Sequence, residues 1–303
     1  MGEETKTYLP TQKIRTLIPG AAQRLKDKYL LKLGSLYNVR SGIESLDESL
    51  DGGWPREEYS VLGGLSGHGK TTLAMQFARQ AAEDDPDSAV IVCSPEMRND
   101  ALAEMELCAL IGHSRRTLKR TPSVLESDVV ESAKKIACDN LFLAQMPRGT
   151  HISALYDTVE ALGKMQPVSL VIVDYAQFVL GRLDVGRRQR FAVAQDIVEV
   201  CEDVSKIRCK TTGVEKSPAV LLTSQVNASR DRNGKITDMT LRESALFEHG
   251  AAAVVFFVRE FDENGDEEGA YFKVTKARFG KLGRIPVKTR PGHYWVGDED
   301  PLF

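Results

Sequence analysis

Short apolar runs alternate with longer amphipathic segments from about residue 40 onwards. The apolar runs predict strands over Tyr59–Gly63, Ala89–Ser94, Leu141–Gln145, Leu170–Asp174, Ala219–Ser224 and Ala252–Val258. The amphipathic segments predict helices over Thr71–Ala82, Asn99–Ile111, Ser127–Ala137, Ile152–Lys164 and Phe191–Lys206. Strands that are apolar throughout are typical of sheets buried on both faces, and the strand–helix alternation favours parallel strands.

The C-terminal tail has a different pattern. Ala270–Arg278 and Arg284–Val296 read as antiparallel strands around Gly280 and Gly283. We therefore expect the α/β fold class: a mostly parallel, twisted sheet flanked by helices on both faces, with an antiparallel C-terminal extension.

The N-terminal end predicts little compact structure. Residues 1–20 are polar and contain Pro10 and Pro19, which indicates a loose arm. Apolar residues then recur at helical spacing and predict a short amphipathic helix: Ala22, Leu25, Tyr29 and Leu33. This helix packs either on its own domain or on a neighbouring subunit. We expect residues 1–38 to form the arm and linker helix, and residues 39–303 to form one α/β domain.

Composition and charge exclude several classes of protein. The hydrophobic fraction of 42% and charged fraction of 27% are those of a globular protein, and no run reaches the ~20 apolar residues of a membrane span. The net charge of −3 weighs against passive coating of nucleic acid, which favours basic domains. It leaves room for a local basic channel, for which three clusters are candidates: Arg182–Arg190, Arg230–Arg242 and Lys273–Arg290.

The cysteines and histidines give no sign of disulfides or of metal binding. Five dispersed cysteines without a C-x-x-C pair indicate reduced thiols, and the N-terminus lacks the apolar core of a secretory signal. We therefore expect a cytoplasmic protein. The five histidines lack metal-ligand spacing, so no structural zinc is expected.

A phosphate-binding loop is the strongest motif. The segment from Gly64 to Thr71 fits G-x-x-x-x-G-K-[ST], and it follows a predicted strand and opens a predicted helix. This context separates a P-loop from a glycine-rich turn with a chance lysine. Backbone N–H groups and the helix N-terminus attract phosphate, Lys70 reaches the β/γ-phosphates and the Thr71 hydroxyl ligates Mg²⁺. We expect ATP and Mg²⁺ as cofactors, and His68 at the loop tip to be incidental. The cofactor-binding candidates are Gly64, Gly67, Gly69, Lys70, Thr71 and Thr72.

Polar side chains also follow or end three of the predicted strands. Asp174 ends a run of four apolar residues, where P-loop ATPases carry the aspartate beside their metal. Glu96 is either a base for the attacking water or a surface glutamate near a helix start. Gln225 is either a sensor of the γ-phosphate or a hydrogen-bonding residue at a strand end.

Six motifs, in order and spacing, resemble the C-terminal motor domain of DnaB-type replicative helicases, within the RecA-like superfamily. They are the entry segment Ser41–Asp47 with Gly52 and Gly53, the glutamate motif Ser94–Met97, the Walker B motif Asp174–Gln177, the sensor strand Ser224–Asn227, the DNA-loop region Leu241–Ser244 with Glu248 and Ala251, and the K-x-R-x-G finger Lys276–Gly280. The resemblance covers about residues 40–296 and implies a RecA-like P-loop NTPase core.

The resemblance also implies roles for particular residues. Glu96 would be the catalytic base, and Asp174 the aspartate beside the metal. Lys276 and Arg278 would act in trans, on ATP held by the neighbouring subunit, where such a cation accelerates phosphoryl transfer by several powers of ten elsewhere. Coupling of ATP turnover to strand movement would start at Gln225.

The partners implied are single-stranded DNA and further copies of the chain. Arg242, Glu243 and Ser244 would hold the DNA, the chain would form a hexameric ring with ATP sites at subunit interfaces, and a loader or primase would be a further partner. The family thus implies an ATP-dependent DNA helicase in replication.

The sequence departs from the family pattern in three places. Ala245 stands where the family usually has glycine, which permits close backbone approach. Residues 208–217 read as an extra stretch before the sensor strand. We also expect the family's N-terminal helical domain to be absent, with only the arm and the short helix before the motor.

Two other classes of P-loop protein compete with the helicase interpretation. A RecA-like recombinase or mediator would form filaments on single-stranded DNA, and the helix at 21–33 is a candidate polymerisation motif. A KaiC-like regulatory ATPase would not bind DNA, and the Arg230–Arg242 cluster weighs weakly against it. The K-x-R-x-G finger and the R-E-S loop favour the helicase.

Overall fold

The computed structural model of the protein describes most of the chain between Tyr37 and Glu299. The described residues are 37–147, 150–174, 187–211, 214–230, 236–241, 245–290 and 294–299. Asn38–Phe303 group into one compact unit. The predicted N-terminal arm and the helix at 21–33 lie outside the described residues.

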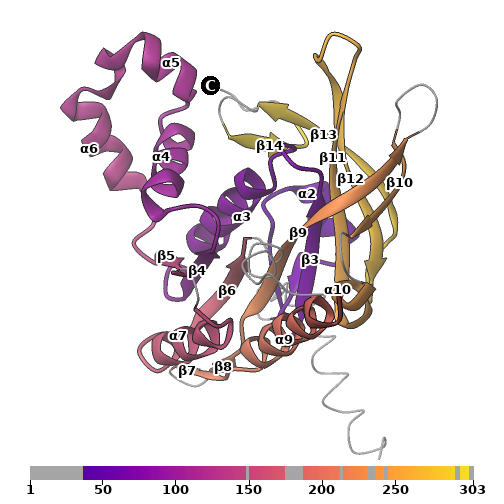
Figure 1. The fold of residues 1–303 in the computed structure, drawn as a ribbon. Helices are drawn as coiled ribbons and strands as arrows, with labels where there is room; N and C mark the ends of the chain where they lie inside the picture. Colours follow the sequence, from indigo (N-terminus) through magenta and orange to yellow (C-terminus); the bar gives the residue numbers. More distant parts are fainter. Residues whose placement is uncertain are drawn as a thin grey trace, which may run out of the picture. The chain divides into compact units, whose positions relative to one another are not determined.

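The core of this unit is a large sheet whose central strands are parallel (Figure 1). The parallel strands, in spatial order, are β11 (Ala253–Phe261), β3 (Tyr59–Gly64), β9 (Ala219–Arg230), β6 (Val168–Val173), β4 (Ala89–Ser94) and β5 (Leu141–Gln145). Every residue of β3, β4 and β6 is buried, as the apolar runs predicted. The prediction of a mostly parallel sheet is confirmed.

The C-terminal strands extend this sheet in antiparallel fashion, which confirms the predicted extension. β12 (Glu267–Ala277) pairs with β11, β13 (Gly283–Arg290) with β12, and β14 (Trp295–Gly297) with β13. The segment expected as one strand over Arg284–Val296 therefore contains two paired strands. β9 is also longer than expected, and β10 (Ile236–Leu241) pairs with its second half.

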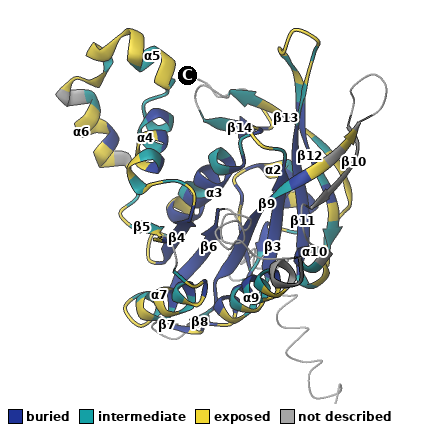
Figure 2. Cartoon of the chain, in the orientation of Figure 1, coloured by how far each residue is buried: buried dark blue, intermediate teal, exposed yellow. Residues whose placement is uncertain are grey.

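Helices cover both faces of the sheet, and alternate strand residues point to opposite cores. Val61 belongs to the core beneath α7 (Ser153–Gly163) and α9 (Arg187–Ser205). Its neighbour Leu62 belongs to the core beneath α3 (Lys70–Asp84) and α4 (Asn99–Leu110). Figure 2 shows the sheet buried between these layers. The five predicted helices are found with ends shifted by few residues, because side-chain periodicity marks a helix better than its ends.

Smaller elements complete the unit. They are β1 (Asn38–Val39), α2 (Glu44–Ser49), β2 (Trp54–Pro55), α5 (Arg115–Arg120), the 3-10 helix η2 (Pro122–Leu125), α6 (Ser127–Ile136), β7 (Cys209–Thr211), β8 (Val214–Lys216) and α10 (Ala245–Gly250). The extra stretch at 208–217 thus contains a short antiparallel pair, β7–β8. Among the described residues, no helix combines the length and apolar character needed to cross a bilayer.

Candidate nucleotide-binding site

The predicted phosphate loop lies between the end of β3 and the start of α3. Lys70, the first residue of α3, is buried, and its Nζ donates to the carbonyls of Gly64 at 2.9 Å and Leu65 at 3.1 Å. Burial lowers the pKa of Lys70, while the charges of Asp174 and Glu96 oppose this shift. The ammonium is therefore held inside the loop beside two carboxylates.

Glycines give this loop its shape. Gly67 and Gly69 have φ angles of +78° and +97°, in the left-handed region that favours glycine. Gly69 is also the N-cap of α3 and offers no capping side chain to the first turn, which contains Lys70, Thr71 and Thr72. Helix N-termini leave N–H groups without partners inside the helix, so the start of α3 suits an anion.

Asp174 follows β6 and lies next to the first turn of α3. Its two carboxylate oxygens accept hydrogen bonds from the Thr71 and Thr223 hydroxyls, both at 2.7 Å, and its N–H donates to the Cys93 carbonyl at 2.9 Å. Desolvation raises the pKa of the buried Asp174 carboxyl, and these hydrogen bonds oppose the shift. A carboxylate and a hydroxyl within 2.7 Å of each other form an oxygen donor pair that fits Mg²⁺.

Glu96 lies just beyond β4, on the same edge of the sheet. Its side chain is exposed, while the preceding Ser94 accepts the Met97 N–H at 3.0 Å and shapes the turn. Partial burial and then the charge of Asp174 raise the pKa of Glu96, and Lys70 opposes the rise. The structure therefore brings Glu96, Asp174 and Lys70 into one electrostatic environment, as expected for groups at the carboxyl ends of parallel strands.

Gln225 is aligned with the phosphate loop but does not end its strand. It pairs with Gly64 across β3 and β9, and β9 continues to Arg230. The returning strand β10 ends at Leu241, opposite Val226. The DNA-binding candidates Arg242, Glu243 and Ser244 lie outside the described residues. The chain nonetheless enters that segment directly beside the Gln225 position.

Lys276 and Arg278 lie at the opposite end of the sheet from the phosphate loop. Arg278 donates to the Glu58 carboxylate at 2.9 Å and to the Gly250 carbonyl at 3.3 Å, and Glu58 directly precedes β3. Lys276 Nζ donates to the carbonyls of Glu248 at 2.7 Å and His249 at 2.8 Å. The six residues of β3 span about 20 Å, so neither cation contacts the Lys70 of its own chain.

The finger segment is held in place by its glycine. A Cβ on Gly280 would lie 2.1 Å from the Ser49 carbonyl oxygen, which accepts the Lys281 N–H at 2.8 Å. The idea that these cations protect an edge strand does not apply, because β12 pairs with β11 on one side and β13 on the other. Arg278 retains substantial exposure, 48% of its side chain.

Two residues of this region escaped the sequence analysis. Thr223 carries a hydroxyl to Asp174, but nothing in its local sequence distinguishes it from other strand threonines. His68 was expected to be incidental, yet it is buried and its Nδ1 accepts the Arg259 N–H at 3.1 Å. Both contacts join segments far apart in sequence, which no local pattern announces.

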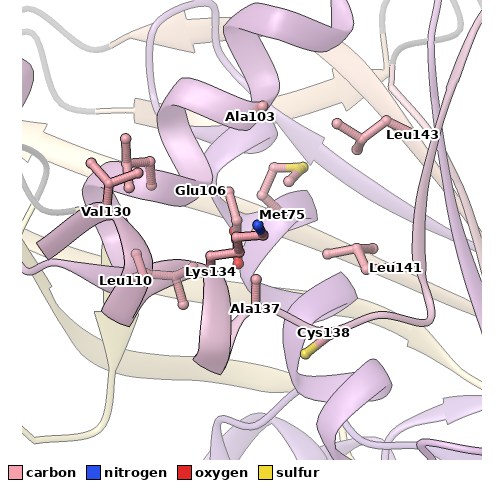
Figure 3. Close-up of a pocket in the computed structure, with 12 residues that line it drawn as sticks. Met75, Ala103, Glu106, Leu110, Val130, Lys134, Ala137, Cys138, Leu141 and Leu143 are labelled. Carbon is pink, nitrogen blue, oxygen red and sulfur yellow. The ribbon is translucent and has the colours of Figure 1, made fainter. Parts of the chain in front are cut away.

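A second cavity lies on the far side of α3 (Figure 3). It has a volume of about 380 Å³ between α3, α4, α6 and β5. Met75, Leu141 and Leu143 contribute apolar walls, whereas Glu106 is paired with Arg79 at 2.9 Å. This apolar lining differs from the cationic and glycine-rich phosphate loop, so the nucleotide candidate remains the loop.

The order of the central strands defines the class of protein. β9 lies between β3, which leads into the phosphate loop, and β6, which carries Asp174. This is the arrangement of a RecA-like nucleotide-binding core. Two solved structures share the fold. One, described as an ATPase domain, has a TM-score of 0.76 at 16% identity, covering 96% of this chain and 100% of its own. A DnaB-like replicative helicase, studied with primase, has a TM-score of 0.72 at 16% identity, covering 96% and 68%.

The family is shown by sequence. The family described as the DnaB-like helicase C-terminal domain matches residues 38–294, and the chain belongs to it. The replicative DNA helicase DnaB of Mycoplasma genitalium is 26% identical over 263 residues, which cover 83% of this chain and 54% of that protein. The chain thus spans about half the length of the curated relatives it matches.

Proposed function

We propose that this chain is the ATP-driven motor of a DnaB-type DNA helicase, which moves along single-stranded DNA in replication. The observation that carries the proposal is the family match over residues 38–294, which runs from the entry segment through the phosphate loop to the finger. The match favours a helicase over a filament-forming recombinase. The curated relatives carry the name of replicative helicase.

In this proposal the phosphate loop binds ATP. Lys70 exchanges its bonds to the loop carbonyls for phosphate oxygens, and the N–H groups from Gly67 to Thr72 face the anion. Thr71 and Asp174 hold Mg²⁺, which when bound neutralises charge on the β- and γ-phosphates. Thr223 supports the metal site by orienting the Asp174 carboxylate through its hydrogen bond.

Glu96 and Gln225 are the proposed hydrolytic residues on the same edge. Glu96 accepts the proton of the attacking water, for which its exposed position beyond β4 leaves access. Gln225, opposite Gly64, senses the γ-phosphate. Its strand continues into the β9–β10 pair, so a shift of Gln225 would be carried to the residues that follow Leu241.

The ATP site is proposed to be completed by a neighbouring copy of the chain. Lys276 and Arg278 lie about 20 Å from their own phosphate loop, so a catalytic role requires a second subunit. A ring or filament supplies such a neighbour at every site. We propose a hexameric ring, in keeping with the helicase function, with one shared ATP site at each interface.

DNA is proposed to bind at the segment that follows β10. Arg242, Glu243 and Ser244 would contact the phosphates of a single strand. Replacing Arg242 by Ala should then weaken binding to oligo-dT and reduce the salt dependence of its affinity by about one phosphate contact. Lys164→Ala, which removes an exposed lysine that follows α7, is the matched control. Unchanged affinity and salt slope in Arg242→Ala would place the DNA contact elsewhere.

The relatives suggest a further protein partner. One structural neighbour is described together with its interactions with primase, and we propose a primase or a loader as a partner here. Co-sedimentation of the assembled protein with purified primase would test this. Absence of a complex at micromolar concentrations, for protein that assembles and hydrolyses ATP, would argue against it.

The helicase proposal is tested by strand separation. A forked duplex with single-stranded tails should be unwound in the presence of ATP and Mg²⁺, and not by Lys70→Ala protein. The recombinase alternative makes a different prediction, because it would form filaments on single strands and exchange strands without unwinding forks. Filament formation without fork unwinding would refute the proposed function.

A further inference from the structure

His68 connects the tip of the phosphate loop to a neighbouring strand. The side chain is only 8% exposed, and its Nδ1 accepts the backbone N–H of Arg259 at 3.1 Å. Its ring lies edge-on to that of Phe261, with 5.7 Å between the centroids. Both partners belong to β11, almost 200 positions later in the chain, so the contact is entirely tertiary.

This contact arises because β11 is longer than β3. The two strands pair up to Phe257 opposite Gly64, where β3 gives way to the loop, whereas β11 continues to Phe261. Beyond that point the N–H groups on this side of β11 have no β3 residue to bond. A buried N–H without a partner is costly, and His68 supplies the acceptor for Arg259.

The partner strand is itself braced. The Arg259 guanidinium lies 4.9 Å from the Phe261 ring centroid, and its Nε donates to the Glu267 carboxylate at 2.9 Å. Glu267 starts β12, and its other carboxylate oxygen accepts a hydrogen bond from the Thr289 hydroxyl of β13. Three strands therefore hold the backbone to which His68 is bonded.

The loop has reason to need such a contact. Gly67 and Gly69 flank His68, and both adopt left-handed backbone conformations, with φ of +78° and +97°. Glycines have more backbone freedom than other residues, so a loop with two of them loses more entropy when it adopts one shape. A side-chain bond between the two glycines limits the shapes that the loop can take.

We propose that His68 is a positioning residue, which holds the phosphate loop in its nucleotide-binding conformation by bonding to β11. The inference rests on the proposed function only in that the loop binds ATP. Because Nδ1 accepts a backbone N–H, the imidazole is neutral with its proton on Nε2, and Nδ1 is not available to the nucleotide as a donor. His68 therefore acts through the loop backbone.

Two substitutions separate the acceptor from the ring. His68→Phe keeps an aromatic ring against Phe261 but removes the acceptor, whereas His68→Asn places a carbonyl oxygen near the position of Nδ1. If the bond positions the loop, His68→Phe should weaken ATP binding roughly two- to tenfold, the equivalent of one net hydrogen bond. His68→Asn should remain within about twofold of the parent.

The chain offers a matched control. His151 is exposed, and its Nδ1 also accepts a backbone N–H, that of Ser153 at 3.2 Å, at the start of α7. His151→Phe removes the same kind of bond from a different part of the molecule, and its ATP affinity should equal that of the parent. Equilibrium titration with ATP and Mg²⁺ gives the affinities, and thermal melting checks that each variant is folded.

Amide hydrogen exchange supplies a readout that needs no nucleotide. The Arg259 N–H should exchange faster in His68→Phe than in the parent, and at nearly the parental rate in His68→Asn. Faster exchange together with weaker ATP binding in His68→Phe would support the inference. Parental affinity in folded His68→Phe would overturn it, as would unchanged exchange at Arg259. Parental protein that bound no ATP would instead refute the proposed function.

Discussion

The two ends of β3 differ in how complete they are within one chain. At the carboxyl end, Lys70 is buried, bonded to two loop carbonyls and close to Asp174 and Glu96. At the amino end, Arg278 has 48% of its side chain exposed and bonds Glu58 and the Gly250 carbonyl. The carboxyl end has phosphate-binding backbone, a metal-binding oxygen pair and a candidate base, whereas the described residues at the amino end offer cations without such a pocket.

This difference suggests a division of labour between neighbouring copies. Among the described residues, the phosphate loop and the finger cations lie at opposite ends of one strand. Two copies arranged head to tail bring these halves together, and repetition of the contact gives a ring or a filament. The predictions that follow perturb one end at a time, beginning with the largest expected effect.

Removing the ammonium at the carboxyl end should have the greatest effect. Lys70→Ala should abolish ATP binding and turnover, since it removes the cation that the loop encloses. Lys164→Ala, an exposed lysine paired with Glu160, should behave as the parent. Steady-state ATPase assays and titration with ATP measure the two quantities. Parental turnover in folded Lys70→Ala would show that the loop is not the catalytic site.

Glu96→Gln should separate hydrolysis from binding. An amide cannot accept the proton of the attacking water, so turnover should fall by roughly 10²–10⁴-fold while ATP affinity stays near that of the parent. Single-turnover assays and equilibrium titration measure these two effects. Glu104→Gln, at an exposed glutamate of α4, is the control. Turnover at the parental rate in Glu96→Gln would assign the base to another residue.

Arg278→Ala tests the amino end and should lower turnover about a hundredfold, the usual cost of losing one group that stabilises the transition state. The decisive measurement is a mixture with Lys70→Ala protein. If the arginine acts in trans, some interfaces combine an intact loop with an intact finger, and ATPase activity should reappear.

The mixing experiment needs evidence of co-assembly, which light scattering of differently tagged proteins provides. Arg284→Ala, at an exposed arginine of the neighbouring strand β13, should not require rescue. Co-assembled mixtures without any recovered activity would leave Arg278 with a structural role or a role within its own subunit.

Glu58→Gln should have the smallest effect. It removes the carboxylate charge paired with Arg278, and partly exposed ion pairs contribute up to about 1 kcal/mol. Unfolding stability should fall by no more than this amount, and turnover should change by less than about fivefold. Chemical denaturation and ATPase assays measure both. A loss as large as that of Arg278→Ala would mean that Glu58 sets the working position of the arginine.

The pattern along the chain determined those features that depend on neighbouring residues. The phosphate loop occupies one continuous segment whose glycines, lysine and threonine are dictated by local backbone geometry. The buried strands β3, β4 and β6 follow from apolar runs, because burial on both faces leaves no room for polar alternation. Parallel strands then bring Asp174 and Glu96 to one edge, which explains why both were found near Lys70.

Only the tertiary structure decided contacts between distant segments. The bond from Thr223 to Asp174 depends on the register of β9 against β6, and that from His68 to Arg259 depends on how far β11 outlasts β3. The pairing of Arg278 with Glu58 depends on which end of the sheet β12 reaches. Side-chain patterns specify which face of a strand is buried, but strand length and register are settled by the packing of the whole sheet.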